Sequence, residues 1–179
     1  MTAKGHVLLA SAIGMSGLLS VKHILPGMLP PPSFLPFIFT GIILGSLLPD
    51  IDEDRSYIGN KFKVFSIVFG ALVKHRTFTH YLFLPILLAY IAFFSFNQHS
   101  LEQLFTYSIC VGMILHDVGD MLTQTGIRGF FYPFFPDTRI AILPSFLRFT
   151  TFSITEYLFI GIVLIPINIY LFFQIRELL

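Results

Sequence analysis

The sequence is poor in charged residues. Only 12% of its 179 residues are charged, whereas 55% are hydrophobic and 22 are phenylalanine. A soluble domain usually carries about 25% charged residues. So little polar material cannot cover a water-exposed globule, and we expect an integral membrane protein. The length predicts a single domain over residues 1–179.

Other scarcities exclude several classes of function. The single cysteine, Cys110, can form no internal disulfide. A net charge of +1 argues against nucleic acid as a partner. No Ser-His-Asp set, glycine-rich phosphate loop or cysteine pair is evident. A metal-free lipid phosphatase needs a basic motif and a separate histidine motif. His116-x-x-x-Asp120 resembles only one part of that set, so this class is excluded.

Hydrophobic runs dominate the chain and predict an all-α, polytopic membrane helix bundle with about five transmembrane helices. Most runs are shorter than the roughly 20 residues that cross the hydrocarbon core. Short spans imply a locally thinned bilayer or polar ends in the interface. The first run carries His6 and is interpreted as a retained helix, not a cleaved signal peptide. The runs are Val7–Val21, Phe34–Leu48, Tyr81–Phe96, Leu104–Leu115 with its continuation, and Ile154–Phe173.

Two further segments are interpreted as interfacial or re-entrant helices. Phe62–Val73 is only a short apolar run with basic flanks, and Ile140–Phe152 has a similar character. Thr123–Thr138, rich in glycine, proline and aromatic residues, is expected to be a loop at the membrane interface. Gly41 and Gly45 have the small-residue spacing that permits close helix approach.

Histidines and acids gather at the ends of the apolar runs. If Phe62–Val73 does not cross the bilayer, all the candidate metal ligands fall on one membrane face, and His23 and His99 fall on the other. Of the 11 Lys and Arg residues, only Lys22 and Arg176 then lie on the other face. An excess of Lys and Arg marks the cytoplasmic side. We therefore predict a multi-pass membrane protein whose metal site faces the cytoplasm.

The spacing of these residues suits metal binding. His116 and Asp120 are four apart and share one helix face. Such pairs also form simple helix contacts, but ionisable groups at span ends are usually functional. Asp117 projects about 100° away and is either a supporting residue or an exposed cap. Asp50 and Asp52 follow Pro49, and in an extended segment both carboxylates would point the same way. A solvated acidic loop is the alternative.

The remaining candidates are His6, His75 and His80, of which the last two flank Arg76. Thr79 is a candidate N-cap for the following helix. Mixed nitrogen and oxygen donors suit Zn²⁺, Mn²⁺ or Fe²⁺ better than Mg²⁺ or Ca²⁺. The set exceeds the four ligands of one tetrahedral zinc, which suggests two or more ions. The predicted metal ligands are His6, Asp50, Asp52, His75, His80, His116 and Asp120.

At these residues the chain resembles the YdjM family of membrane-bound metal-dependent hydrolases. The matching blocks run from residue 5 to about 126, in the family's order and spacing. Distant similarity of this family to zinc-dependent phospholipase C enzymes implies an all-helical fold with clustered metals and phosphoester hydrolysis. The blocks are Gly5-His6, Leu48–Asp52, His75–His80, His116–Asp120 and Leu122–Gly126.

The functional hypothesis is a hydrolase that cleaves a phosphate or phosphodiester bond of a membrane lipid or lipid-linked substrate with a metal-activated water. Arg76 and Arg128 are candidates to hold the phosphate. The residues expected to take part in catalysis are Asp50, Asp52, His116, Asp120, Arg76 and Arg128. The alternatives are a divalent-metal transporter and a scaffold with a structural metal. A transporter needs ionisable residues near the bilayer midplane, and the sequence has almost none there.

Overall fold

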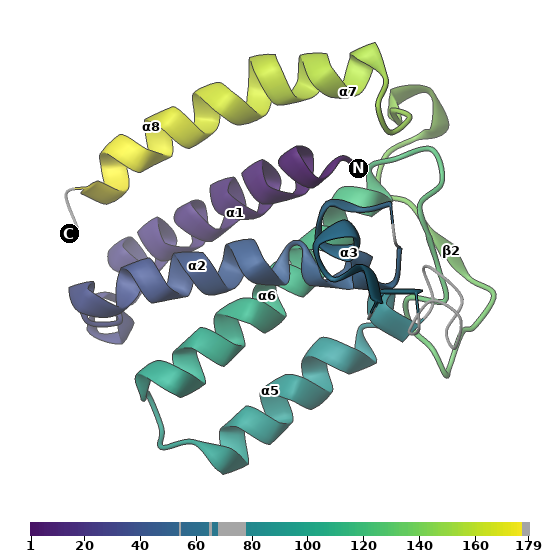
Figure 1. Ribbon diagram of the computed structural model, residues 1–179. Coiled ribbons are helices and arrows are strands. Elements are labelled where there is room, and N and C mark those ends of the chain that lie inside the picture. The colour runs from purple at the N-terminus through teal and green to yellow at the C-terminus, as the bar shows by residue number, and fades with distance from the viewer. Residues whose placement is uncertain (54, 65, 68–77, 177–179) are drawn as a thin grey trace.

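The computed structural model describes residues 1–53, 55–64, 66–67 and 78–176, and it is mostly helical (Figure 1). Three helices, α1, α2 and α6, pack against one another, while α5 packs on α6 and α8 on α1. The main helices are α1 (Ala3–Ile24), α2 (Leu35–Gly45), α5 (Phe83–Ser95), α6 (Leu101–Met121) and α8 (Ile165–Arg176). The shorter ones are α3 (Tyr57–Lys61) and α7 (Ile154–Leu158).

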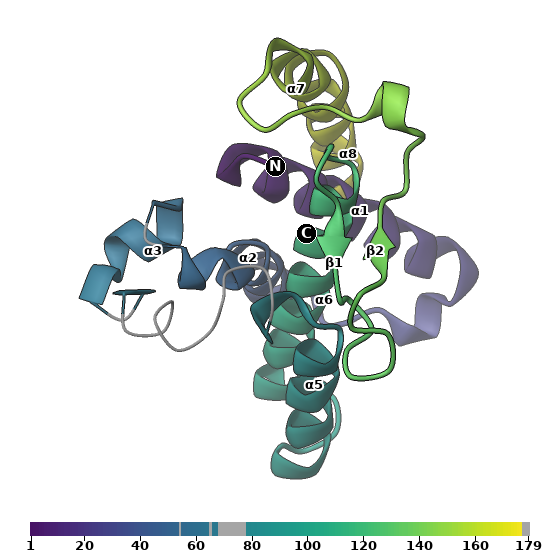
Figure 2. The ribbon, with the colours of Figure 1, turned by 90° about the vertical axis from the view of Figure 1, so that its right-hand side faces the viewer.

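One end of the bundle gathers segments from the whole sequence. The N-terminus, α3, the start of α7 and the last turns of α6 lie at this end, and the C-terminus lies at the opposite end (Figure 1). Two short antiparallel strands, β1 (Ile127–Arg128) and β2 (Arg139–Ile140), also lie there. Figure 2, viewed from this end, shows the strands in front of α6. We call it the polar end, because most of the candidate ligands lie there.

Glycines let α2 and α6 approach closely. A β-carbon on Gly41 would overlap Ser108, and one on Gly45 would overlap the carbonyl of Ile109. A β-carbon on Gly112 of α6 would likewise overlap the carbonyl of Ile42 on α2. The predicted role of Gly41 and Gly45 in close helix packing is therefore confirmed. This contact fixes the end of α2, and the segment that follows it, against the last turns of α6.

Three helical stretches are long and apolar enough to cross a membrane: Ala3–Ile24, Pro32–Asp52 and Ile154–Arg176. Of the other two predicted spans, α5 has only 13 residues, fewer than the roughly 20 that a crossing needs. The other, α6, has 21 residues but contains Glu102, Asp117 and Asp120. The count of five crossings therefore stays a prediction.

The last stretch is one helix with an internal distortion. It runs from α7 through a π-helical segment, Phe159–Leu164, into α8. Pro166 lacks the N–H that would bond to the carbonyl of Ile162, which accounts for the widened turn. Asn168 donates hydrogen bonds to the carbonyls of Leu164 (2.7 Å) and Leu8 (2.9 Å), which ties α8 to α1.

Two predicted segments differ from the structure. Ile140–Phe152 contains the end of β2 and one short 3₁₀ turn, Ser145–Leu147, so the interfacial helix predicted there is wrong. The Gln124 side chain donates to the carbonyls of Ser145 and Arg148, which occupies acceptors that a helix would use internally. Thr123–Thr138 contains β1, so this segment is not wholly a loop. Most of Phe62–Val73 lies outside the described residues.

Candidate metal centre

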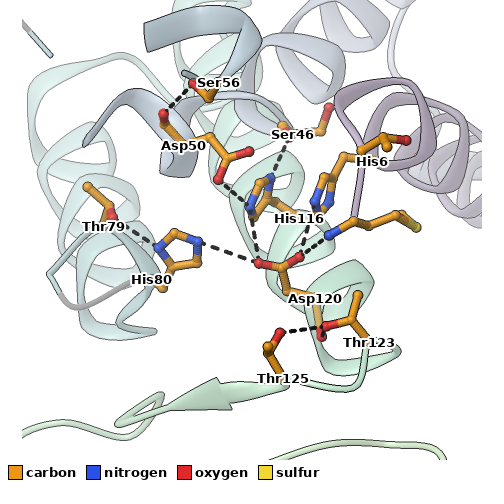
Figure 3. A network of polar contacts seen from close by, with 12 residues as sticks. His6, Ser46, Asp50, Ser56, Thr79, His80, His116, Asp120, Thr123 and Thr125 are labelled. Atoms are coloured by element: carbon orange, nitrogen blue, oxygen red, sulfur yellow. Dashed lines mark hydrogen bonds and ion pairs between the residues drawn. The ribbon is translucent and has the colours of Figure 1, made fainter. Parts of the chain in front are cut away.

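The polar end contains a buried cluster of histidine and aspartate side chains (Figure 3). Four of its members, His6, His80, His116 and Asp120, are at most 1% exposed, and the side chain of Asp50 is 21% exposed. They come from four segments. His6 lies on α1, His116 and Asp120 on α6, and Asp50 and His80 on the 3₁₀ helices Leu48–Asp52 and Phe78–His80.

Asp120 lies at the centre of the cluster. Its Oδ1 is 3.3 Å from Nε2 of His6, and its Oδ2 is 3.8 Å from Nε2 of His80 and 3.9 Å from Nε2 of His116. The amine of Met1 also lies 2.5 Å from Oδ1. One buried carboxylate therefore faces three imidazole rings and an amine that come from different parts of the chain.

The hydrogen bond of His116 fixes its tautomer. Nδ1 lies 2.8 Å from the carbonyl oxygen of Ser46, at the end of α2. A carbonyl can only accept, so Nδ1 carries a proton and Nε2 of the neutral ring presents a lone pair. That lone pair faces Asp50 Oδ1 at 3.6 Å and Asp120 Oδ2 at 3.9 Å. Both distances are too long for hydrogen bonds.

His80 is held by a similar chain of hydrogen bonds. The hydroxyl of Thr79 donates to Asp52 Oδ2 at 2.9 Å and lies 3.0 Å from Nδ1 of His80. A hydroxyl has one proton, so Thr79 accepts from Nδ1, and Nε2 of His80 presents its lone pair toward Asp120. The predicted N-cap role of Thr79 is wrong, because its side chain bonds to Asp52 and His80 and α5 starts at Phe83.

His6 reaches the cluster because α6 has no side chain at Gly119. The ring of His6 stacks on that of His116, with 3.7 Å between centroids and an interplanar angle of 7°. A β-carbon on Gly119 would lie 2.8 Å from Nδ1 of His6, closer than real β-carbons approach. The glycine between His116 and Asp120 therefore makes room for a ligand from another helix.

The cluster contains two groups whose potential ligand atoms all lie within 4.8 Å of one another: His6, Asp50 and His116, and His80, His116 and Asp120. Two ligand atoms of a tetrahedral zinc, each about 2.0–2.1 Å from the ion, lie about 3.4 Å apart. The spacings in the cluster, from 3.3 to 3.9 Å, are close to this value. The residues present therefore fit a divalent cation with mixed nitrogen and oxygen ligands.

Asp50 and Asp52 do not point the same way. The structure has a 3₁₀ helix over Leu48–Asp52, so the predicted extended segment is wrong. With three residues per turn, side chains two apart diverge. Asp50 faces His116, whereas Asp52 accepts from Thr79 and, among the described residues, belongs to neither group of potential ligands. Its assignment as a metal ligand stays a prediction.

The other predicted site residues have different surroundings. His75 and Arg76 lie outside the described residues. Arg128 is exposed on β1, opposite Arg139, and its side chain makes no hydrogen bond or ion pair with the described part of the chain. Asp117 is 1% exposed, which excludes the exposed cap.

Sequence reasoning missed Glu156, which is fully buried near the cluster. Its carboxylate accepts from the main-chain N–H groups of Thr2 (2.6 Å) and Phe152 (2.7 Å). Ser153 and Glu156 have the spacing of a capping box, and Ser153 Oγ does accept from the N–H of Glu156. That pattern predicts the start of a helix, but the bond to Thr2 is a tertiary contact that no local pattern indicates.

The fold and the cluster define a class: a helical membrane protein with buried His and Asp groups able to hold a metal ion. More specifically, the chain belongs to the YdjM inner membrane protein family, whose model matches residues 1–177. The expected family membership is therefore confirmed. The chain is also similar to YvsG of Bacillus subtilis (strain 168), described as uncharacterized, with 33% identity over 110 residues. That match covers 62% of this chain and 64% of YvsG. No solved structure matches the chain.

Proposed function

We propose that the protein is a membrane-bound metal-dependent hydrolase that cleaves a phosphate or phosphodiester bond in a lipid-like substrate. The observation that carries the proposal is the orientation of two buried imidazoles. Nε2 of His116 and of His80 present lone pairs toward carboxylate oxygens at 3.6 to 3.9 Å. Opposed lone pairs and negative charge in a buried site are unfavourable, and a divalent cation between them removes the conflict.

A cation held by His6, Asp50, His80, His116 and Asp120 would supply Lewis acidity and lower the pKa of a water molecule. The chain's own groups have separate tasks. Ser46 and Thr79 orient the two imidazoles through their Nδ1 atoms. Asp50 is the most exposed of these side chains, and we assign it to contact with the substrate and water. Both potential ligand groups include His116, and its Nε2 lone pair can bind one ion. The proposal therefore requires at least one bound ion. A second ion is part of the proposal.

The proposed orientation places the polar end at the cytoplasmic face of a multi-pass bacterial inner-membrane protein. The excess of Lys and Arg on this side supports it. His6 lies near the start of α1, and His116 and Asp120 lie in the last turns of α6. This location at the ends of apolar helices supports a substrate whose phosphate lies at headgroup depth.

The test compares the wild type with His116→Ala and with His23→Ala, a control at the other end of α1. We expect purified wild type to contain Zn²⁺, Mn²⁺ or Fe²⁺ and to release phosphate from phosphatidic acid or an isoprenyl phosphate. His116→Ala removes a group shared by both ligand sets, so it should lose metal and activity, while His23→Ala should retain both. Metal is measured by elemental analysis and hydrolysis by phosphate release.

Two results would contradict the proposal. A metal-loaded wild type that hydrolyses no phosphoester, or that changes in no respect on His116→Ala, is incompatible with it. Metal flux into proteoliposomes would favour a transporter, and a tightly bound metal with no position open to water would favour a structural role.

A further inference from the structure

A cavity of about 610 Å³ adjoins the histidine–aspartate cluster at Asp50. It lies between the start of α1, the residues Asp50, Glu53 and Arg55–Tyr57, and the loop that leads into α7. Asp50 therefore lies both in the cluster and in the wall of the cavity, with its Oδ1 3.6 Å from His116. Anything bound in this cavity would lie beside the atoms that the proposed reaction uses.

The loop on the far side of the cavity is tied to α1 by Glu156. Its carboxylate bonds to the N–H of Thr2 on one wall and to the N–H of Phe152 on the other. Phe152 has a φ of +64°, which is unusual for a residue with a side chain, and the residue is 74% exposed. The buried carboxylate thus holds a strained loop in place and fixes the position of this loop relative to the start of α1.

Two cationic side chains, Lys4 and Arg55, and two anionic side chains, Asp50 and Glu53, line this cavity. Glu53 accepts from the main-chain N–H of Arg55 at 3.3 Å, and Asp50 faces His116. Both cationic side chains belong to exposed residues. With a divalent cation at Asp50, as the proposed function requires, the lining would carry a net positive charge. Such a lining suits a phosphate group.

An apolar groove of about 510 Å³ lies beside the cavity, lined by residues of α1 and α2. The two spaces share Ala3, Lys4 and Tyr57 in their linings. Beyond these shared residues the groove is lined only by apolar side chains, namely Val7, Leu8, Ile43 and Leu47. Both volumes fall within the range of about 300–1,000 Å³ that is usual for small-molecule sites. A cavity with charged side chains in its wall thus lies next to an apolar groove, and the two have three lining residues in common.

We infer that the two spaces together bind one membrane-derived amphiphile, with its phosphate beside Lys4, Arg55 and Asp50 and its hydrocarbon chain between α1 and α2. Lys4 lines both spaces, as a residue with an apolar stem and a charged tip can. The inference rests on the proposed function and deepens it. It assigns phosphate binding to Lys4 and Arg55, and it directs the chain along Val7 and Ile43.

The test uses the full chain, loaded with Zn²⁺, in phosphatidylcholine nanodiscs. A phosphatidic acid with a photoreactive diazirine in its acyl chain is added, and crosslinked residues are identified by mass spectrometry. We expect crosslinks to concentrate on Val7, Leu8, Ile43 and Leu47. Excess unlabelled phosphatidic acid should suppress them. Excess phosphatidylcholine should not, because its headgroup carries no net negative charge, and excess inorganic phosphate should not, because it has no hydrocarbon chain.

Matched variants test the two halves of the site. Lys4→Ala combined with Arg55→Ala should lower the groove crosslinks about tenfold, as loss of two modest ionic contacts implies. Lys22→Ala combined with Arg176→Ala, which removes the same residue types at the opposite end, should leave them unchanged. Val7→Trp should block the groove, whereas Ile13→Trp, farther along α1, should not. Zinc content of each variant verifies that the cluster is intact.

The outcomes separate this inference from the proposed function. Crosslinks spread evenly over other exposed apolar residues, such as Phe93 and Phe172, would overturn the inference even if phosphoester hydrolysis is observed. Crosslinks unchanged by the Lys4 and Arg55 substitutions would overturn it as well. Crosslinks confined to the groove in a protein that hydrolyses no phosphoester would leave the binding site standing and overturn the proposed activity alone.

Discussion

At the scale of single residues, the metal-binding capacity of the cluster depends on groups that do not themselves face the centre. The Ser46 carbonyl and the Thr79 hydroxyl each fix Nδ1 of a histidine, so that Nε2 of His116 and His80 point inward. Neither residue could be predicted from the sequence, because a backbone carbonyl has no sequence pattern and Thr79 resembles a helix cap. The histidines and Asp120 themselves could be predicted, because ionisable groups in the ends of membrane helices are costly and usually functional.

We predict that Thr79→Val lowers zinc affinity about tenfold to a hundredfold, as is usual when a supporting hydrogen bond to a ligand is lost. The valine removes the link from Asp52 to His80 and leaves the ring free to rotate. Thr40→Val is the matched control, since its hydroxyl bonds only to the carbonyl of Pro36 on its own helix. Competition with a chelator of known affinity measures the change, and equal affinities in the two variants would refute the role of Thr79.

At the scale of helices, the site depends on how closely α2 approaches α6. The end of α2 provides the Ser46 carbonyl, and the 3₁₀ helix after it carries Asp50. The small-residue spacing of Gly41 and Gly45 predicted this contact. The 3₁₀ geometry of Leu48–Asp52 could not be predicted, because Pro49 restricts its neighbour without choosing between an extended segment and a tight turn.

We predict that Gly45→Ala destabilises the protein by about 1–3 kcal/mol, because the new methyl group overpacks the contact with α6. It should also weaken zinc binding, since it moves Ser46 and Asp50 away from His116. Gly17→Ala is the control, because no atom lies within 4 Å of a β-carbon at that position. Thermal unfolding and zinc content of the two variants in the same detergent measure the difference. A Gly45→Ala protein as stable and as rich in zinc as Gly17→Ala would be evidence against the packing argument.

At the scale of the whole molecule, ligands separated by up to 114 positions, from His6 to Asp120, meet at one end of the bundle. Counting the apolar runs predicted this convergence, because each crossing of a bilayer returns the chain to a known side. The number of crossings was harder to predict. The length of an apolar run does not distinguish a short membrane-spanning helix from a helix that stops within the interface, and α5 could be either.

The predicted orientation can be tested in cells. In a Cys110→Ser background, His99→Cys lies at the end opposite the cluster and Arg128→Cys at the polar end. If the polar end is cytoplasmic, a membrane-impermeant maleimide added to spheroplasts should label position 99 and not position 128 until the cells are lysed. Labelling of position 128 before lysis would reverse the assigned orientation.

The central claim is that the buried imidazoles and carboxylates bind a divalent cation. X-ray absorption spectroscopy at the metal edge, on protein purified without chelators, tests it most directly. The account predicts at least one tightly bound ion per chain, coordinated by nitrogen and oxygen, with outer-shell scattering from imidazole rings and no sulfur neighbour. A protein with only trace metal, or a spectrum without imidazole scattering, would contradict it.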